Sequence, residues 1–489
     1  MAVGKRLLEA LREWGAERVY AVLGTDHITL MREFEAGTGV SLFTVPHEFV
    51  AASMALGESI SGKLGVVLLH SVPGSLNASG VLMNALTSRV PLLALVGESP
   101  PEAGEFGRTL RVHWSSDLEF PRLPVKRVFE MREKPVETLN RAIALALSEP
   151  QGPVIVRFRR DLLAKECGGE KGRKTPYFPG ASKRAIERAN ELLSKLTRVQ
   201  LITWRGGRSD EAFDAIKGFA DSNNVPVANP VGERVNYPSN GEMASTVLDA
   251  EGYIIVEHEA PQVEGIKVWV DPDPLYSLIE DHSFDCDLCV QSTPQDFLPH
   301  LRVKNDLDWA RAGREELEKR RESGSTRCVL ARELSRTGLT VFDEYQLEKD
   351  CIVATRREQY FGDLASNHLG WAFGASLGYS VARGERTVAV MGDGAFYLSS
   401  PLSNAYVIRK AKLDPIVVVV DNSSWGSVRR EYERFFGEGT NLTELDNLEF
   451  SKFAETIDAE YLETKDPRGL AEEVVKLKGP VVVRVKERG

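Results

Sequence analysis

Short apolar runs alternate with amphipathic helical segments along almost the entire chain, and this alternation limits the possible folds more than any other feature. In the first third, strand-like runs occur at residues 18–24 (RVYAVLG), 65–70 (GVVLLH) and 153–158 (PVIVRF), with helical patterns between them. Consecutive strands joined by helices form parallel sheets, because a parallel pair needs a long crossover connection. The sequence therefore predicts an α/β fold of doubly wound parallel sheets.

The alternation falls into three blocks. With 489 residues, the chain is too long for a single core. Residues 167–182 (CGGEKGRKTPYFPGAS) are rich in glycine, proline and charge, which is typical of a linker. A charged helical stretch at residues 309–322 separates the second block from the third. We expect three domains, at residues 1–166, 183–305 and 323–489.

The first and third blocks end in similar segments. Residues 152–161 read GPVIVRFRRD and residues 479–488 read GPVVVRVKER, and each segment follows an amphipathic helical pattern. Such an internal similarity predicts two related units on either side of a different one.

Charge and hydropathy exclude several classes of partner. The net charge of −10 argues against nucleic acid and anionic membranes as partners. No apolar run reaches membrane-spanning length. The first fifteen residues form an amphipathic pattern without the apolar stretch of a signal peptide. We therefore expect a cytoplasmic protein.

The five cysteines are too few and too scattered to predict a disulfide framework: Cys167, Cys286, Cys289, Cys328 and Cys351. Cys286 and Cys289 form a single C-x-x-C motif with no second pair. We interpret these two as ordinary small side chains rather than as a metal or redox site.

A candidate metal site lies at the ends of two strands in the third block. By itself, the Gly-Asp-Gly motif at residues 392–394 predicts only a tight turn after a strand. The next strand, PIVVVVD at residues 415–421, ends directly before Asn422. A right-handed crossover brings both strand ends to one edge of the sheet. Carboxylate and amide oxygens suit Mg²⁺ that also binds phosphate, so Asp393 and Asn422 are predicted to share a magnesium–phosphate site.

This arrangement resembles the cofactor-binding motif of thiamine-diphosphate-dependent 2-oxo acid decarboxylases and acetolactate synthases. The resemblance implies that Asp393, Asn422 and the carbonyl of Ser424 hold Mg²⁺, and that Gly394 and Ala395 contact the diphosphate. It implies further cofactor contacts by five residues of the same two loops: Gly392, Trp425, Gly426, Ser427 and Val428.

Two further segments of the third block resemble the same family. Residues 366–378 (SNHLGWAFGASLG) resemble its glycine-rich segment, which implies that Leu369 supports a bent cofactor and that the carbonyl of Asn367 accepts a hydrogen bond from the aminopyrimidine. Residues 342–347 (FDEYQL) resemble its segment near the diphosphate.

The first block resembles the family's pyrimidine-binding domain, and the third its diphosphate-binding domain. Glu48 stands at the start of a helix after a short strand, and residues 70–77 (HSVPGSLN) resemble the family's S-x-P-G-x-x-N loop, with Pro73 and Asn77 as cofactor contacts. The resemblance implies that Glu48 drives the aminopyrimidine of the cofactor to its imino form, which is acid–base catalysis through the cofactor. Alternatively, Glu48 is only an acid that the dipole of its helix favours.

Three positions bear on which member of the family the chain is. Thr25 falls in the substrate loop, where benzoylformate decarboxylase has a serine, and His70 coincides with a catalytic histidine of that enzyme. Alternatively, His70 is a histidine satisfied at a strand end. Val428 stands where pyruvate decarboxylase has a glutamate, which disfavours that enzyme's proton-transfer layout. Arg429 and Arg430 are expected on a solvated helix face rather than at a substrate carboxylate.

The resemblance implies a thiamine-diphosphate- and Mg²⁺-dependent lyase or carboligase that decarboxylates a small 2-oxo acid through ylide and enamine intermediates. An acetolactate synthase that condenses two pyruvates, with a possible regulatory subunit, is one alternative. A cofactor-binding paralogue without turnover is another, and an unrelated nucleotide-binding protein is a third.

The family also implies an assembly and a second possible cofactor. Its active sites lie between subunits, so a homodimer or homotetramer is expected. Residues 270–281 (VDPDPLYSLIED) resemble the family's central domain, which binds FAD in some members. We favour no FAD, because the segment has no FAD-specific feature.

Overall fold

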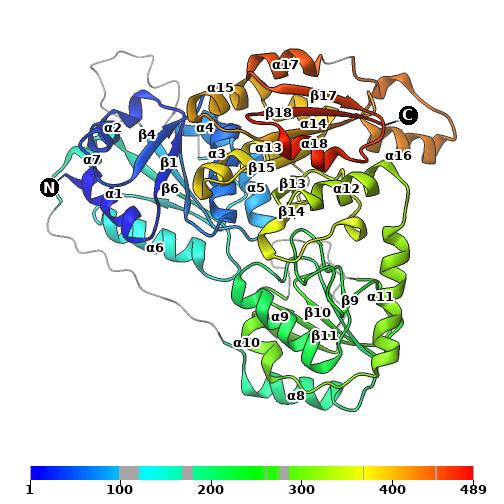
Figure 1. Ribbon diagram of the computed structural model, residues 1–489. Helices are drawn as coiled ribbons and strands as arrows, with labels where there is room; N and C mark the ends of the chain where they lie inside the picture. Colours follow the sequence, from blue (N-terminus) through cyan, green and yellow to red (C-terminus); the bar gives the residue numbers. More distant parts are fainter. Residues whose placement is uncertain are drawn as a thin grey trace.

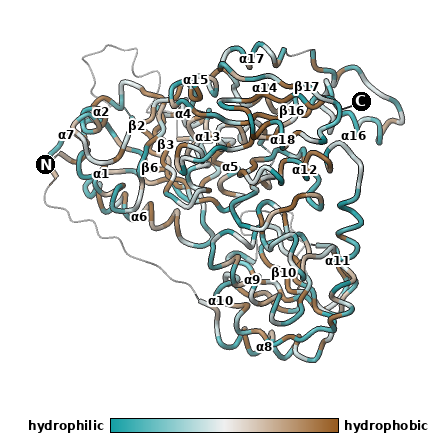
Figure 2. Tube along the Cα trace, viewed as in Figure 1, coloured by the Kyte–Doolittle hydropathy of each residue, from teal (hydrophilic) through white to brown (hydrophobic). Residues whose placement is uncertain are grey.

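The computed structural model describes residues 2–98, 120–167, 180–258, 261–274, 286–366, 368–446 and 449–487. Within these ranges the chain forms three parallel six-stranded sheets with helices around them (Figure 1). The predicted α/β class is therefore confirmed. Hydrophobic residues are concentrated along the strands (Figure 2), as expected for parallel sheets covered on both faces. Every described helix is too short or too polar to span a membrane.

The N-terminal sheet has the strand order β2-β1-β3-β4-β6-β5. Its strands are β1 (Arg18–Ala21), β2 (Ser41–Thr44), β3 (Gly65–His70), β4 (Leu92–Glu98), β5 (Arg127–Glu130) and β6 (Pro153–Arg159). Its helices are α1 (Val3–Glu13), α2 (Ile28–Glu35), α3 (Glu48–Ile60), α4 (Ser71–Asn77), α5 (Ser79–Thr87), α6 (Pro135–Leu147) and α7 (Arg160–Ala164), with a short 3₁₀ helix, η1, at Thr25–His27.

The C-terminal sheet repeats this order, position by position, as β14-β13-β15-β16-β18-β17. Its strands are β13 (Thr340–Asp343), β14 (Tyr360–Gly362), β15 (Thr387–Gly392), β16 (Ile416–Asp421), β17 (Glu460–Thr464) and β18 (Val481–Lys486). Its helices are α12 (Thr326–Arg336), α13 (Trp371–Arg383), α14 (Asp393–Leu398), α15 (Pro401–Ala411), α16 (Gly426–Phe436), α17 (Phe450–Thr456) and α18 (Leu470–Lys476). The two similar closing segments form β6 and β18, which hold equivalent places, so the topology supports two related units.

The central sheet has a different order, β12-β11-β10-β7-β8-β9, which reverses direction between β10 and β7. This is the order of a dinucleotide-binding sheet, with its switch point between those two strands. The strands are β7 (Val199–Thr203), β8 (Val227–Ala228), β9 (Ala244–Ser245), β10 (Gly252–Val256), β11 (Ile266–Asp271) and β12 (Leu288–Gln291). The helices are α8 (Lys183–Leu193), α9 (Asp210–Asn223), α10 (Pro294–Phe297) and α11 (Leu307–Arg321).

The N- and C-terminal units share one hydrophobic core, in which α3 crosses α13 at very short range. A Cβ atom at Gly57 would lie 1.9 Å from the carbonyl oxygen of Ala375, and one at Gly378 would lie 2.0 Å from that of Met54. Only glycine allows the two backbones to approach so closely. The relative placement of the two units therefore depends on these residues.

Two predicted loops are helical. The S-x-P-G-x-x-N segment forms α4, whose first residue, Ser71, has a φ of +45°. Asp393 does not lie in a turn but begins α14, directly after β15. In both places the chain passes from strand to helix at the sheet edge without an intervening loop.

The interpretation of the cysteines is wrong, because four of them are paired. Disulfides join Cys286 to Cys289 and Cys328 to Cys351, with Cα–Cα distances of 6.0 and 5.2 Å. The first lies at the start of β12, and the second ties α12 to the chain after β13. A separation of 23 residues in the sequence could not show that the last two cysteines are adjacent in space.

Candidate active site

A cavity of about 420 Å³ opens at the carboxyl ends of β15 and β16. All the C-terminal residues predicted to contact the cofactor line this cavity, apart from Asn367, which lies outside the described residues. They are Leu369, Gly392, Asp393, Gly394, Ala395, Asn422, Ser424, Trp425, Gly426, Ser427 and Val428. The cavity thus lies where open α/β sheets bind ligands.

The predicted metal ligands converge on a single backbone amide. The N–H of Ser424 lies 3.2 Å from Asp393 Oδ2 and 3.0 Å from Asn422 Oδ1, so both oxygens accept from one donor. The carbonyl of Ser424 turns back toward the N–H of Gly426 at 2.8 Å and keeps a second lone pair. One carboxylate, one amide and one carbonyl oxygen form a donor set that fits Mg²⁺.

The carboxyl group of Asp393 has no cationic partner among the described residues. The pKa of Asp393 is raised to about 6, mainly by burial and also by the neighbouring carboxyl group of Asp421, although the N–H groups of Gly394 and Ser424 lower it. Asp421 itself pairs with Arg484 at 2.6 Å. Asp393 is therefore a buried acid at the sheet edge whose charge a bound cation would neutralise.

Two glycines keep this edge open. A Cβ atom at Gly426 would lie 2.5 Å from Asn422 Nδ2, and one at Gly394 would lie 2.4 Å from the ring of Trp425. Side chains at either position would displace the amide or the indole. These two glycines therefore leave room for the side chains of Asn422 and Trp425, and they also allow a ligand to approach the backbone.

The chain after β13 adds residues that the sequence did not assign: Glu344, Tyr345 and Gln346 line the cavity. Glu344 is fully buried and accepts hydrogen bonds from the N–H groups of Gly370 and Ala372, at 2.9 and 2.6 Å. It thereby anchors the segment that carries Leu369. Burial raises the pKa of Glu344 to about 8, although the two N–H groups lower it. The FDEYQL resemblance marked this segment without giving a role to any one residue.

Two arginines also line the cavity, Arg327 and Arg430. Arg327 pairs with Glu487 in two hydrogen bonds of 2.8 Å. Arg430 is exposed, as the sequence predicted, yet it also borders the cavity. Arg430 lies one helical turn after Gly426, on the same face of α16. This spacing could have predicted that Arg430 borders the cavity.

In the N-terminal unit, Glu48 lies at the predicted place, the first residue of α3. Its Oε2 accepts a hydrogen bond of 3.1 Å from Asn77 at the end of α4. His47 caps the same helix by accepting from the N–H of Phe49. Pro73 and Asn77 are exposed on α4. Glu48 is therefore held by a side chain of the predicted pyrimidine-binding loop.

Thr25 and His70 lie close together at the ends of β1 and β3. Thr25 is exposed, and its carbonyl accepts from Arg160 at 3.1 Å. His70 contacts the next residue, Asp26, with 2.5 Å between Nδ1 and Oδ1. The hydrogen bond to Asp26 raises the pKa of His70. Sequence reasoning overlooked Asp26, although it follows the strand next to the one that ends in His70.

The described lining of the cavity contains none of the predicted N-terminal site residues. The described residues that line the cavity come only from the C-terminal part, between Arg327 and Arg430. Helix α2, next to Thr25, and helix α16, which follows Trp425, lie at opposite ends of the upper layer in Figure 1. We call this cavity the C-terminal half-site, and the group around Glu48, Thr25 and His70 the N-terminal half-site.

Both ends of the chain match sequence models of one enzyme family. Residues 1–110 match the thiamine pyrophosphate enzyme, N-terminal TPP binding domain, and residues 349–485 match the C-terminal TPP binding domain. Together with the fold, these matches define a thiamine-diphosphate-dependent enzyme. The chain belongs to this superfamily, which confirms the predicted resemblance.

Known proteins of similar length agree with this class. The large subunit of acetolactate synthase isozyme 2 of Escherichia coli is 23% identical over 94% of this chain and 90% of its own length. An acetolactate synthase of Bacillus subtilis is 24% identical over 98% of this chain and 92% of its own length. The crystal structure of benzoylformate decarboxylase from Polynucleobacter necessarius covers 100% of this chain and 99% of that chain, with a TM-score of 0.81 at 19% identity. This likeness confirms the fold.

Proposed function

We propose that the chain is a thiamine-diphosphate- and Mg²⁺-dependent enzyme that decarboxylates a small 2-oxo acid. The observation that carries this proposal is the convergence of Asp393 and Asn422 at the cavity. The proposed domains are residues 1–166 for the pyrimidine, 183–305 for the central unit and 323–489 for the diphosphate.

In this proposal the C-terminal half-site binds the metal and the diphosphate. Asp393, Asn422 and the Ser424 carbonyl hold Mg²⁺, and the backbone at Gly394 and Ala395 approaches the diphosphate. When bound, thiamine diphosphate supplies a nucleophilic carbon and an electron sink for decarboxylation.

In this proposal the residues of the N-terminal half-site hold and transfer protons. Glu48 holds a proton at the aminopyrimidine ring nitrogen, and Asn77 fixes the carboxyl group by donating to Oε2. His70, which is partly exposed at the end of β3, exchanges a proton with the reacting substrate. Leu369, held in place through Glu344, supports the cofactor from the other half-site.

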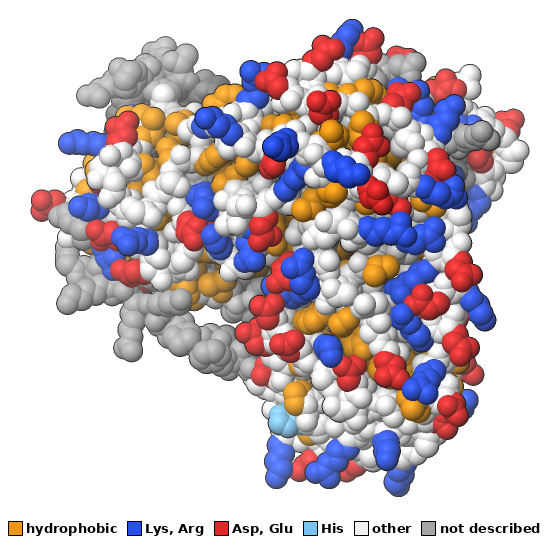
Figure 3. Space-filling view, viewed as in Figure 1, with side chains coloured by type: hydrophobic (Ala, Val, Ile, Leu, Met, Phe, Trp, Pro, Cys, Tyr) orange, Lys and Arg blue, Asp and Glu red, His pale blue; other side chains and the backbone are white. Residues whose placement is uncertain are grey.

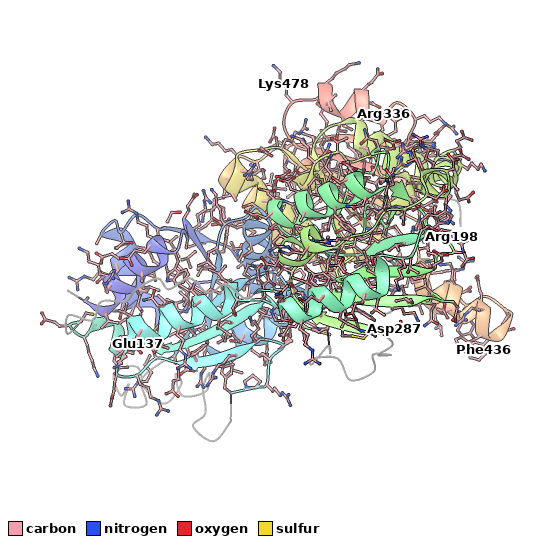
Figure 4. All side chains as sticks on the ribbon, turned by 90° about the horizontal axis from the view of Figure 1, so that it is seen from below. Glu137, Arg198, Asp287, Arg336, Phe436 and Lys478 are labelled. Atoms are coloured by element: carbon pink, nitrogen blue, oxygen red, sulfur yellow. A yellow bond between two sulfur atoms is a disulfide. The ribbon has the colours of Figure 1, made fainter. Side chains whose placement is uncertain are left out.

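A second copy of the chain completes each site. Apolar side chains are exposed beside both half-sites, with Ile28 and Leu76 about half exposed at the first, and Val428 and Phe436 59% and 68% exposed at the second. Phe436 projects outward at the end of α16 (Figure 4). These surfaces support a homodimer or homotetramer in which the N-terminal half-site of one copy faces the cavity of another.

Carboligation is a second possible outcome of the same chemistry. The chain has the apolar Val428, rather than an acid, at the edge of the cavity, and both relatives named above are acetolactate synthases. Acetolactate formed from pyruvate would indicate a synthase, with a regulatory subunit as its proposed partner. An aldehyde formed from a bulkier 2-oxo acid would indicate a decarboxylase.

The Glu48→Gln variant tests the proposal. We measure CO₂ release from a series of 2-oxo acids with thiamine diphosphate and Mg²⁺, and identify the products. Turnover should fall about 100-fold or more, because Gln cannot exchange the proton. The matched control is Glu137→Gln, since Glu137 is also a first-turn helix acid but is exposed. Unchanged turnover in Glu48→Gln, or equal losses in both variants, would refute the role of Glu48.

A further inference from the structure

The contact between Asp26 and His70 is a built arrangement that the proposed function leaves unexplained. The carboxyl group of Asp26 is 1% exposed, whereas the imidazole of His70 is 21% exposed. An ionised carboxylate can only accept, so a contact of 2.5 Å puts the hydrogen on His70 Nδ1. Nε2 is then the nitrogen that gains and loses a proton.

The protein keeps space for this pair with two glycines. A Cβ atom at Gly24 would lie 2.3 Å from His70 Nδ1 and 2.6 Å from Asp26 Oδ1. A Cβ atom at Gly97, the residue paired with His70 in the sheet, would lie 2.7 Å from Asp26 Oδ2. Any larger residue at either position would push the carboxylate away from the imidazole.

The neighbouring histidine is arranged differently. His27 is fully buried, with Nε2 3.1 Å from the carbonyl of Leu69 and Nδ1 accepting from the N–H of Gly24 at 3.1 Å. These two contacts require a neutral ring with its hydrogen on Nε2. Burial also lowers the pKa of His27. His27 therefore does not take the charge that Asp26 can stabilise, and His70 is the ring that can.

We propose that Asp26 is the positioning residue of His70, and that it fixes the orientation and tautomer with which His70 exchanges a proton with the substrate. The inference rests on the proposed function for its catalytic part. Asp26 is shielded from solvent and acts only through His70. It stabilises the imidazolium form by charge and by the short hydrogen bond.

Other charged groups near the pair have smaller effects. Glu48, at the start of α3, also raises the pKa of His70, but less than Asp26 does. Glu98, at the end of β4, pairs with Arg157 at 2.5 Å. Glu98→Gln is therefore a suitable control, because it also removes a buried carboxylate at this sheet edge.

The test is an NMR titration of the full-length protein without cofactor, with ¹³C-labelled histidine and His70→Gln to assign the signal. In the wild type, the midpoint of His70 should lie above the ordinary value of 6.5. It should fall by about one pH unit or more in Asp26→Asn and change little in Glu98→Gln. An equal midpoint in Asp26→Asn and the wild type would overturn the proposal.

Turnover provides a second readout. The Asp26→Asn enzyme should show a lower kcat with little change in KM, and the limb of its pH profile that belongs to His70 should shift in the same direction as the midpoint. Adding Asp26→Asn to His70→Gln should cost no further turnover, whereas additive losses would contradict the proposal. If Asp26→Asn does not fold, a wild-type midpoint at or below 6.5 still overturns it. A shifted midpoint in a protein that decarboxylates no 2-oxo acid would refute the proposed function and leave the pairing supported.

Discussion

The carboxyl edges of the central and C-terminal sheets are built on the same kind of scaffold but carry different charge patterns. At the central edge, Glu257 follows β10 and Asp271 ends β11, and both contact Arg89 from the N-terminal unit, at 3.1 and 2.6 Å. Glu257 also pairs with Arg208 at 2.6 Å, and Arg208 reaches Glu149 at 3.0 Å. Apart from Glu149, these side chains are at most 7% exposed.

At the C-terminal edge, by contrast, Arg484 pairs with Asp421, and Asp393 has no cationic partner among the described residues. The comparison shows that a buried acid at a sheet edge can be neutralised in two ways. Where an arginine from another unit reaches the edge, as Arg89 does, the acids join domains together. Where no arginine reaches the acid, the edge is suited to a metal and its phosphate ligand.

The described part of the central edge presents carboxylates where the pyrophosphate of FAD would bind. In a doubly wound sheet that group binds at the switch point, here between β7 and β10. Glu257 stands at this point with its two arginines already bound to it. These arginines outweigh the effect of burial, which alone would raise the pKa of Glu257, and hold it below its ordinary value. An added diphosphate would meet ionised carboxylates.

The largest expected effect is the loss of stability in Glu257→Gln. Removing one member of a buried ion network leaves Arg208 and Arg89 without full compensation, so we expect a loss of about 3–5 kcal/mol in unfolding free energy. Chemical denaturation measures it. The matched control is Glu242→Gln, because the exposed pair Glu242–Arg311 should contribute less than about 1 kcal/mol. Equal losses of unfolding free energy in the two variants would show that the buried ion network does not hold the domains together.

The next effect is on ligand binding at the other edge. Asp393→Asn should weaken the binding of thiamine diphosphate in Mg²⁺ about 100-fold, because the site loses its charged ligand. Asp271→Asn at the central edge should lower stability but leave this affinity unchanged. Calorimetric titration of both variants compares them. If Asp271→Asn weakened the cofactor as much as Asp393→Asn, the two edges would not have separate roles.

The smallest effect is in the pH dependence of the protein without cofactor. In the folded protein the pKa of Glu344 is about 8, above its ordinary value of 4.5. The contribution of Glu344 to stability is therefore lost as the pH rises from about 4.5 to about 8. Glu344→Gln should reduce the fall in stability between pH 5 and 8 by on the order of 2 kcal/mol. The lowered pKa of Glu257 has the opposite sign, because its contribution is lost as pH falls below about 4.5.

Thermal unfolding at several pH values checks this difference. Glu344→Gln should flatten the curve on its alkaline side, and Glu257→Gln on its acid side. An unaltered alkaline slope in Glu344→Gln would mean that Glu344 is already ionised in the folded protein.

The sequence predicted the parts of the fold and of the candidate site that follow from local pattern. Strand–helix alternation identified the three sheets, and adjacent strand ends brought Asp393 and Asn422 together. The ends of the adjacent strands β1 and β3 also lie together, so the sequence pattern could have paired Asp26 with His70. After β1 it identified only Thr25, the residue before Asp26. In Figure 3, acidic and basic side chains are interspersed on the visible face, and such a surface gives no pattern to interpret.

The central ion network and the Cys328–Cys351 disulfide were beyond sequence reasoning. Arg89, Glu149, Arg208 and Glu257 come from separate elements, and their contact depends on how the N-terminal and central units dock. No periodicity or spacing encodes such a contact. The Cys328–Cys351 disulfide could not be predicted for the same reason. The Cys286–Cys289 disulfide was not predicted because a single C-x-x-C motif is ambiguous.

The most direct test of the account is calorimetric titration of thiamine diphosphate into the wild-type protein, with Mg²⁺ and after chelation of divalent cations. The uncompensated acid at the C-terminal edge predicts binding of one cofactor per chain in Mg²⁺, and a loss of about 100-fold or more in affinity after chelation. Equal affinity with and without the metal, or no binding in either condition, would contradict the claim that Asp393 and Asn422 form a metal–diphosphate site.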